Sequence, residues 1–124
     1  MIHYFLEGNL EFDYRDSWKK HVRDIKKWDF SNLPVNDYPI LQGLIDDRKY
    51  SVLSDFIRWW AVYEYGGIYL DFDVELIKPI DSVLQYESFV CIEGYPVYPN
   101  GAVSGGHKGN TYHLEILNEY LPLS

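Results

Sequence analysis

Cysteine and long apolar runs are nearly absent from this 124-residue chain. Cys91 is its single cysteine, so no disulfide can form within the chain, and its apolar surroundings, SFVCIE, predict a small buried side chain rather than a nucleophile or a metal ligand. The stretch FIRWWAVY is too short to span a bilayer and contains Arg58, and the N-terminus has no basic leader. We therefore expect a cytoplasmic protein without a transmembrane segment.

Basic residues are scarce as well. The chain has 11 Lys and Arg against 19 Asp and Glu, for a formal net charge of −8 at pH 7. This balance argues against sequence-independent binding to nucleic-acid phosphates. An anionic small substrate would need a metal ion or a few suitably positioned cations beside it. The length suits one hydrophobic core, so we expect residues 1–124 to form a single domain.

Acidic residues occur in a short, otherwise apolar stretch, YGGIYLDFDVE at residues 65–75. Strand alternation divides it into an apolar side and a polar side: Ile68, Leu70, Phe72 and Val74 against Tyr69, Asp71, Asp73 and Glu75. Neighbours on one side of a strand lie about 6.6 Å apart. Two ionised carboxylates at that distance repel by about 0.6 kcal/mol in water and about 2.5 kcal/mol at an effective dielectric near 20. A hard cation such as Mg²⁺ or Mn²⁺ relieves this repulsion and prefers oxygen ligands, which makes Asp71 and Asp73 candidate metal ligands.

The clearest predicted helix covers residues 52–65 and ends at Gly66. Its apolar stripe consists of Leu53, Phe56, Ile57, Trp60 and Ala61. Asp55 and Arg58 lie three residues apart on it, so their side chains are neighbours, and this spacing by itself favours an ordinary surface ion pair worth about 0.2–0.5 kcal/mol.

Hydrophobic spacing also predicts a helix over residues 16–28, where Trp18, Val22, Ile25 and Trp28 match one stripe. Residues 28–39 read as a strand end followed by a loop. We expect strands at 2–6, from Gly67 onward, at 87–93 and briefly at 102–104, and a last helix over 111–121 with Asn110 as its N-cap. Strands that alternate with helices predict an α/β fold.

The run SDFIRWWAVYEYGGIYLDFDVELIKPID, residues 54–81, resembles the sugar-binding region of the glycosyltransferase family 32 type. That family includes initiating mannosyltransferases, capsular-polysaccharide transferases and, more remotely, the large glucosylating toxins. Its S-D-x-x-R helix, Y-G-G-I-Y-L turn and D-x-D strand end are matched by Ser54, Asp55 and Arg58, by residues 65–70, and by Asp71 and Asp73. The opening IHYFLEGN is similar to the family's first strand and nucleotide-binding turn.

The resemblance implies a Rossmann-like nucleotide-diphospho-sugar transferase of the A-type fold, in a small or truncated version because only 43 residues follow Asp81. It implies transfer from a UDP- or GDP-sugar to a glycan or another acceptor, with retention of configuration and a Mn²⁺ or Mg²⁺ cofactor. A second copy of the chain could complete the acceptor side. The implied site residues are the metal ligands Asp71 and Asp73, the donor-sugar contacts Ser54, Asp55 and Arg58, and the base pocket of Ile2, His3, Tyr4 and Phe5.

Two alternatives remain open. LDFDVE also looks like the first motif of haloacid-dehalogenase-type phosphatases, in which the first Asp attacks phosphorus; Ser88 and Lys108 could serve as its later residues, but no Asp-Asp pair follows. The other alternative is a nucleotide-sugar- or cation-binding remnant without activity. The four histidines show no zinc spacing and are expected to be structural or solvated: His3, His21, His107 and His113.

Overall fold

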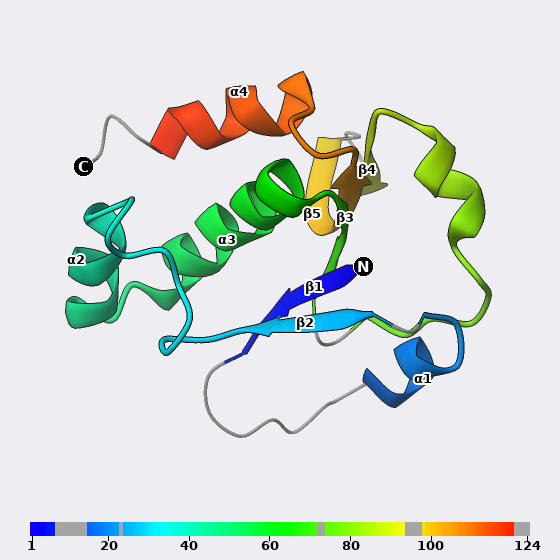
Figure 1. The fold of residues 1–124 in the computed structure, drawn as a ribbon, viewed down its shortest axis with the longest axis horizontal. Helices are drawn as coiled ribbons and strands as arrows, with labels where there is room; N and C mark the ends of the chain where they lie inside the picture. The colour runs from blue at the N-terminus through cyan, green and yellow to red at the C-terminus, as the bar shows by residue number, and fades with distance from the viewer. Residues whose placement is uncertain (7–14, 23, 72–73, 94–97, 121–124) are drawn as a thin grey trace.

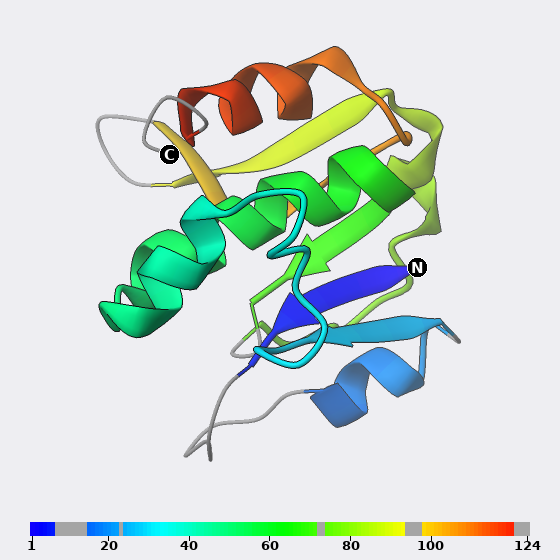
Figure 2. The same ribbon diagram turned by 60° about the vertical axis from the view of Figure 1, so that its left-hand side comes forward.

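The computed structural model describes residues 1–6, 15–22, 24–71, 74–93 and 98–120. In these ranges one mixed sheet of five strands has the order β2-β1-β3-β5-β4, with helices on both of its faces (Figures 1 and 2). The strands are β1 Ile2–Phe5, β2 Ile25–Trp28, β3 Gly67–Leu70, β4 Ser88–Glu93 and β5 Tyr98–Gly106. β1 pairs in parallel with β2 and β3, whereas β5 pairs antiparallel with both β3 and β4. The expected α/β fold is confirmed.

The strand predicted at the start of the chain is β1, and it lies between β2 and β3 as a core strand. Its four residues are all buried. Because side chains alternate across a strand, Ile2 and Tyr4 pack on one face of the sheet and Phe5 packs on the other. Both faces of the sheet are therefore covered, as is usual where parallel strands are flanked by helices.

The face that carries Phe5 is covered by α2 Ile40–Asp46, α3 Tyr50–Tyr65 and α4 Thr111–Tyr120 (Figure 1). α3 confirms the clearest predicted helix, and Gly66 ends it with φ 71° while its N–H donates to Val62 O at 2.8 Å. A Cβ atom at Gly66 would come within 2.9 Å of Lys108 N, so the turn requires glycine on two counts. Asn110 caps α4 as predicted, because its Oδ1 accepts from His113 N at 2.9 Å.

The opposite face is covered by α1 Arg15–Lys19 and by the segment around the 3₁₀ helix Asp81–Gln85. Trp18 of α1 is fully buried there, and its Nε1 donates to Val74 O at 2.7 Å. The predicted helix over residues 16–28 is therefore wrong: it ends at Lys19, and residues 25–28 form β2. Pairing with β1, from Ile2 with Ile25 to Phe5 with Trp28, overrides the helical spacing.

The polar side expected for the strand after Gly67 is also corrected. Ile68 and Leu70 pack beside Trp18, as expected, but Tyr69 on the other side is 1% exposed and lies in the core beneath α3. The strand ends at Leu70, and Phe72 and Asp73 lie outside the described residues. Tyr69 is enclosed because α3 covers this face, which the two-residue period of a strand cannot show.

Cys91 is exposed, so the prediction of a buried cysteine is wrong. It lies on β4, the outermost strand, at a register irregularity between Val90 and Cys91. An edge strand is covered by neighbours on one side only, and an apolar local sequence cannot bury it. β5 is longer than the short strand expected at 102–104, and α2 lies in a segment for which the sequence pattern had indicated no element.

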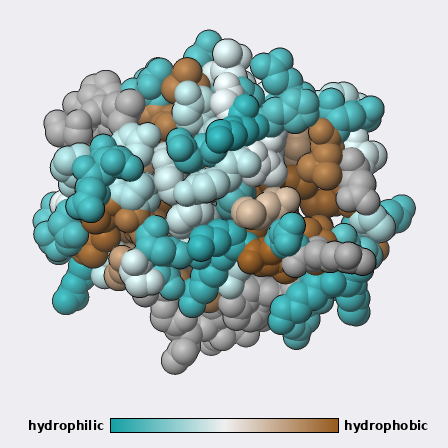
Figure 3. All heavy atoms as spheres, viewed as in Figure 1, coloured by the Kyte–Doolittle hydropathy of each residue, from teal (hydrophilic) through white to brown (hydrophobic). Residues whose placement is uncertain are grey.

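Apolar side chains on the face seen in Figure 3 form separate patches among polar side chains. Among the described residues, no helix is both long enough and apolar enough to cross a membrane.

Candidate functional site

The candidate site lies where the first half of α3 meets the residue that follows β3. α3 runs back across the sheet before the Gly66–Gly67 turn starts β3, so its early residues lie at the carboxyl end of that strand (Figure 2). In sheets with parallel strands, ligands bind at the carboxyl ends. Asp55 and Arg58 come from α3, and Asp71 comes directly after β3.

Arg58 joins the two acidic residues. Its Nη2 donates to Asp71 Oδ1 at 3.0 Å, and its Nη1 lies 3.6 Å from Asp55 Oδ1. The Arg58 side chain is 14% exposed, whereas the Asp55 side chain is 47% exposed and the Asp71 side chain 28% exposed. Arg58 is therefore an enclosed cation between two partly open carboxylates, and its nearer partner is Asp71 rather than its helical neighbour Asp55.

Tyr69 supports this arrangement from below. The Arg58 guanidinium lies over the Tyr69 ring, with Cζ 5.3 Å from the ring centroid. The Tyr69 hydroxyl is 3.4 Å from Ser54 Oγ. Burial, followed by the negative charge of Asp71, raises the pKa of Tyr69 to about 12, so the phenol stays neutral. Sequence reasoning missed Tyr69 as part of the site, although its position two residues before Asp71 on the same side of the strand was an available signal.

The atom Arg58 Nε is buried and has no hydrogen-bond partner within the described ranges. The guanidinium contacts Asp71 through Nη2, Asp55 through Nη1 and the Tyr69 ring, whereas Nε contributes no hydrogen bond there. A buried donor without a partner is costly.

The metal assignment rests on Asp71 and Asp73. Asp71 is a suitable ligand type, because it offers a partly exposed carboxylate, which Mg²⁺ and Mn²⁺ prefer. Arg58 orients this carboxylate through a hydrogen bond to Oδ1. Asp73 lies outside the described residues. In the described ranges, no three His, Cys, Asp or Glu side chains come together in a way that could hold a metal.

The structure brings Ser54, Asp55, Arg58 and Asp71 together. The β1 residues assigned to the base pocket are enclosed in the sheet: Ile2 and His3 are 0% exposed, Tyr4 6% and Phe5 8%. His3 is not brought to the group. Its Nδ1 accepts from Trp28 Nε1 at 3.2 Å and its Nε2 lies 2.9 Å from Gly66 O, beyond the far end of α3.

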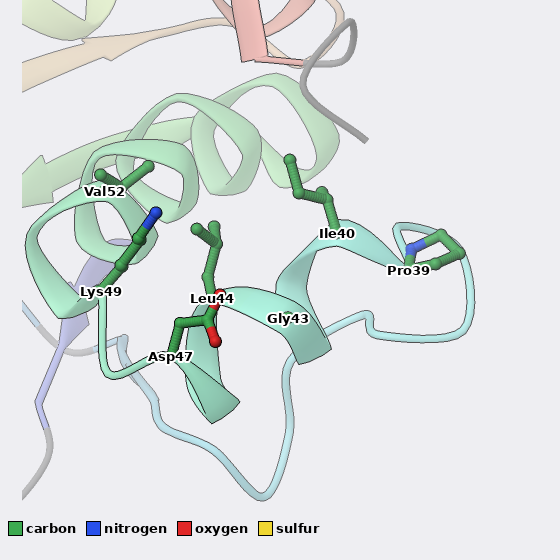
Figure 4. A pocket seen from close by; sticks show the side chains of 7 residues that line it. All are labelled: Pro39, Ile40, Gly43, Leu44, Asp47, Lys49 and Val52. Carbon is green, nitrogen blue, oxygen red and sulfur yellow. The ribbon is translucent and has the colours of Figure 1, made fainter.

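A cavity of about 590 Å³ opens between α2 and the start of α3 (Figure 4). Ile40, Leu44 and Val52 line it with apolar surface, and Asp47 and Lys49 lie at its edge. Val52 precedes Asp55 by three residues, so the two are neighbours on the surface of α3. The cavity is thus adjacent to the candidate site, although no residue of that site lines it.

A family model described as the glycosyltransferase sugar-binding region containing a DXD motif matches residues 8–90. Inositol phosphoceramide mannosyltransferase 3 of Schizosaccharomyces pombe is 33% identical over 84 residues, which cover 67% of this chain and 23% of that protein. An uncharacterised Arabidopsis thaliana protein is 39% identical over 70 residues, covering 54% of this chain and 10% of that protein.

Inositol phosphoceramide mannosyltransferase 1 of the same yeast is 35% identical over 43 residues, covering 35% of this chain and 14% of that protein. The chain therefore spans less than a quarter of the length of each of these relatives.

Proposed function

The chain belongs to the family of glycosyltransferase sugar-binding regions that contain a DXD motif, and from that premise we propose that it transfers a sugar from a nucleotide-diphospho-sugar donor. The observation that carries this proposal is the Asp55–Arg58–Asp71 group at the carboxyl end of β3. The donor is a UDP- or GDP-sugar, and transfer proceeds with retention. Because two of the similar proteins are mannosyltransferases by name, GDP-mannose is the first donor to test.

Asp55 and Arg58 bind the donor sugar in this proposal. The half-exposed carboxylate of Asp55 accepts hydrogen bonds from sugar hydroxyls, and Arg58 holds that carboxylate in place from behind. Ser54 supports the group through its contact with the Tyr69 hydroxyl. A rigid set of donors and acceptors lowers the entropy lost when the sugar binds.

Asp71 and Asp73 would hold the divalent metal, Mn²⁺ or Mg²⁺. When bound, the metal supplies positive charge that neutralises the diphosphate leaving group as the glycosidic bond breaks. Arg58 orients the Asp71 carboxylate by donating to its Oδ1. A chain with a net charge of −8 needs this compensation to bind an anionic donor.

The acceptor is a glycan or another hydroxyl compound. Inositol phosphoceramide, named for two relatives, is one compound to test. Residues 1–124 as a single domain, a possible homo-oligomer and the cytoplasmic location stay predictions from the sequence. The family match favours glycosyl transfer over the phosphatase alternative.

The test measures donor binding by calorimetry and nucleotide release for GDP-mannose, UDP-glucose and UDP-galactose, with Mn²⁺ and after chelation. We expect saturable binding and release that require the metal. Asp55→Asn and Arg58→Lys should weaken the full donor more than the bare nucleoside diphosphate. The matched control is Asp16→Asn, since the Asp16 side chain is 94% exposed on α1. Binding without release would support the inactive remnant, and hydrolysis of p-nitrophenyl phosphate would support a phosphatase.

A further inference from the structure

A second cavity, of about 440 Å³, lies at the other end of α3. The loop between β2 and α2 contributes Asp37 and Tyr38 to it, and the last turn of α3 contributes Glu64 and Tyr65. Tyr65 follows Asp55 by ten residues, so at 1.5 Å per residue these two residues are about 15 Å apart along the helix. It is large enough for a small ligand.

One wall of this cavity is aromatic. Trp28, Trp60 and Tyr65 pack against one another with ring centroids 4.9, 5.6 and 5.7 Å apart. The two tryptophans are each 4% exposed, whereas Tyr65 is 53% exposed. The buried indoles thus hold the Tyr65 ring in position from behind, and a large part of that ring faces outward as a fixed apolar surface.

The cavity lining also carries acceptor groups. Asp37 and Glu64 are exposed, and neither forms a hydrogen bond or an ion pair with any residue that the structure describes. Tyr38 also lines the cavity: burial raises the pKa of its hydroxyl, and the negative charges of Glu64 and Asp37 raise it further. Tyr38 therefore remains a neutral hydroxyl in the cavity lining.

Nearby lysines do not neutralise these carboxylates. Lys26 Nζ lies over the Trp28 ring, 5.1 Å from its centroid, and Lys27 pairs with Asp29 at 3.8 Å. The loop is also held by its own hydrogen bonds, because Asn32 Nδ2 donates to Lys27 O at 2.9 Å and Tyr38 N donates to Pro34 O at 3.0 Å. The cavity is thus formed before any ligand binds.

We propose that this cavity binds a neutral saccharide, with one pyranose ring packed on Tyr65 and its hydroxyls donating to Asp37 and Glu64. A pyranose offers C–H groups on one face and O–H donors at its rim, which matches a cavity lined by both an aromatic surface and two carboxylates. An anionic ligand such as a nucleotide would be repelled. A purely apolar ligand would leave both carboxylates desolvated and unpaired. The site is separate from the proposed donor site and does not depend on the transferase reaction.

The experiment titrates the protein, without nucleotide or metal, with methyl α-D-mannopyranoside, methyl β-D-glucopyranoside and methyl β-D-galactopyranoside. Calorimetry and the fluorescence of Trp28 and Trp60 report binding. We expect saturation with a Kd on the order of 1 mM for at least one glycoside. Tyr65→Ala and the double variant Asp37→Asn/Glu64→Gln should each weaken binding about tenfold. Tyr65→Phe keeps the ring and should stay within about twofold of the unmodified protein.

Two further variants are controls. Tyr50→Ala removes another exposed tyrosine, 42% exposed at the start of α3, and should leave glycoside affinity unchanged. Asp55→Asn changes the proposed donor site and should also leave it unchanged. Absence of saturable binding to all three glycosides would overturn the proposal, as would an equal loss of affinity in Asp55→Asn. Tighter binding of tetramethylammonium, lost in the same cavity variants, would identify an organic-cation site instead.

Discussion

The two ends of α3 differ in how charge is paired. Toward its start lies Asp55, which together with Asp71 encloses Arg58 at mid-helix, so the positive charge of Arg58 is matched by neighbouring carboxylates. Near its end, Asp37 and Glu64 line a cavity, and neither carboxylate forms an ion pair with a side chain that the structure describes. A paired group holds its own side chains in place. An unpaired group is open to any ligand that supplies hydrogen-bond donors.

The largest effect that would test this comparison is expected from Asp71→Asn. The change removes the negative partner of Arg58 and a proposed metal ligand. We expect kcat/KM for transfer to fall on the order of 1000-fold, about 4 kcal/mol of transition-state stabilisation. Steady-state nucleotide release measures it, with Asp16→Asn as the control. Activity within about threefold of the unmodified protein would remove Asp71 from the mechanism.

Acidification tests a buried histidine on α4, outside both sites. His113 is 0% exposed, and burial lowers its pKa from 6.5 to about 4. The unfolded chain therefore binds the proton more readily, and the stability contributed by neutral His113 is complete above pH 6.5 and is lost as the pH falls toward 4. The loss should reach about 3 kcal/mol.

Urea unfolding at pH 7.5, 6, 5 and 4 measures this loss. His113→Leu should flatten the profile over the same range, whereas the exposed His107 should not affect it when changed to Gln. Burial also lowers the pKa of His3, so part of the slope should persist in His113→Leu. A profile identical to that of the unmodified protein would show that His113 does not set the acid sensitivity.

Arg58→Ala should destabilise the fold by about 2 kcal/mol, because it removes a charge-assisted hydrogen bond and leaves the Asp71 carboxylate without that partner. Arg58→Lys keeps the charge but loses the two-pronged geometry and should cost about half as much. Denaturant midpoints compare both with Glu64→Gln, which changes an unpaired carboxylate. A larger loss in Glu64→Gln than in Arg58→Ala would reverse the contrast between the two ends.

The smallest expected effect is that of Asn110→Ala. It removes the N-cap of α4, which packs beside α3 without belonging to either site. We expect a loss of about 1 kcal/mol in the free energy of unfolding. Donor and glycoside affinities should both stay unchanged in calorimetry. A change in either affinity would show that the packing of α4 against α3 influences the corresponding binding site.

Local patterns predicted those parts of the fold in which local and tertiary preferences agree. α3 has a continuous apolar stripe and a glycine stop, and β1 is a short apolar run, so both appear as expected. β2 was missed because Trp18, Val22, Ile25 and Trp28 have a spacing that fits a helix, although the structure divides them between α1 and a strand. Pairing with β1 decided that outcome, and a short stretch of sequence around residues 25–28 does not show that pairing.

The candidate donor site was predictable in part for the same reason. Asp55 and Arg58 are neighbours on one helix, and Asp71 follows a short turn and strand, so the group comes from one continuous segment. Tyr69 was missed because its burial depends on α3 lying above it. The second cavity was not predictable at all, since Trp28, Asp37 and Tyr65 come from distant parts of the chain.

By itself, the amino-acid sequence determined the family, the helix that carries Asp55 and Arg58, and the strand that begins at Gly67. Only the tertiary structure decided which of these charges are enclosed and which face water. Periodicity describes how a residue is oriented on its own element, whereas burial and charge pairing depend on what other elements place against it. Asp55 and Glu64 lie on the same helix, yet their surroundings differ because different segments pack against the two ends of α3.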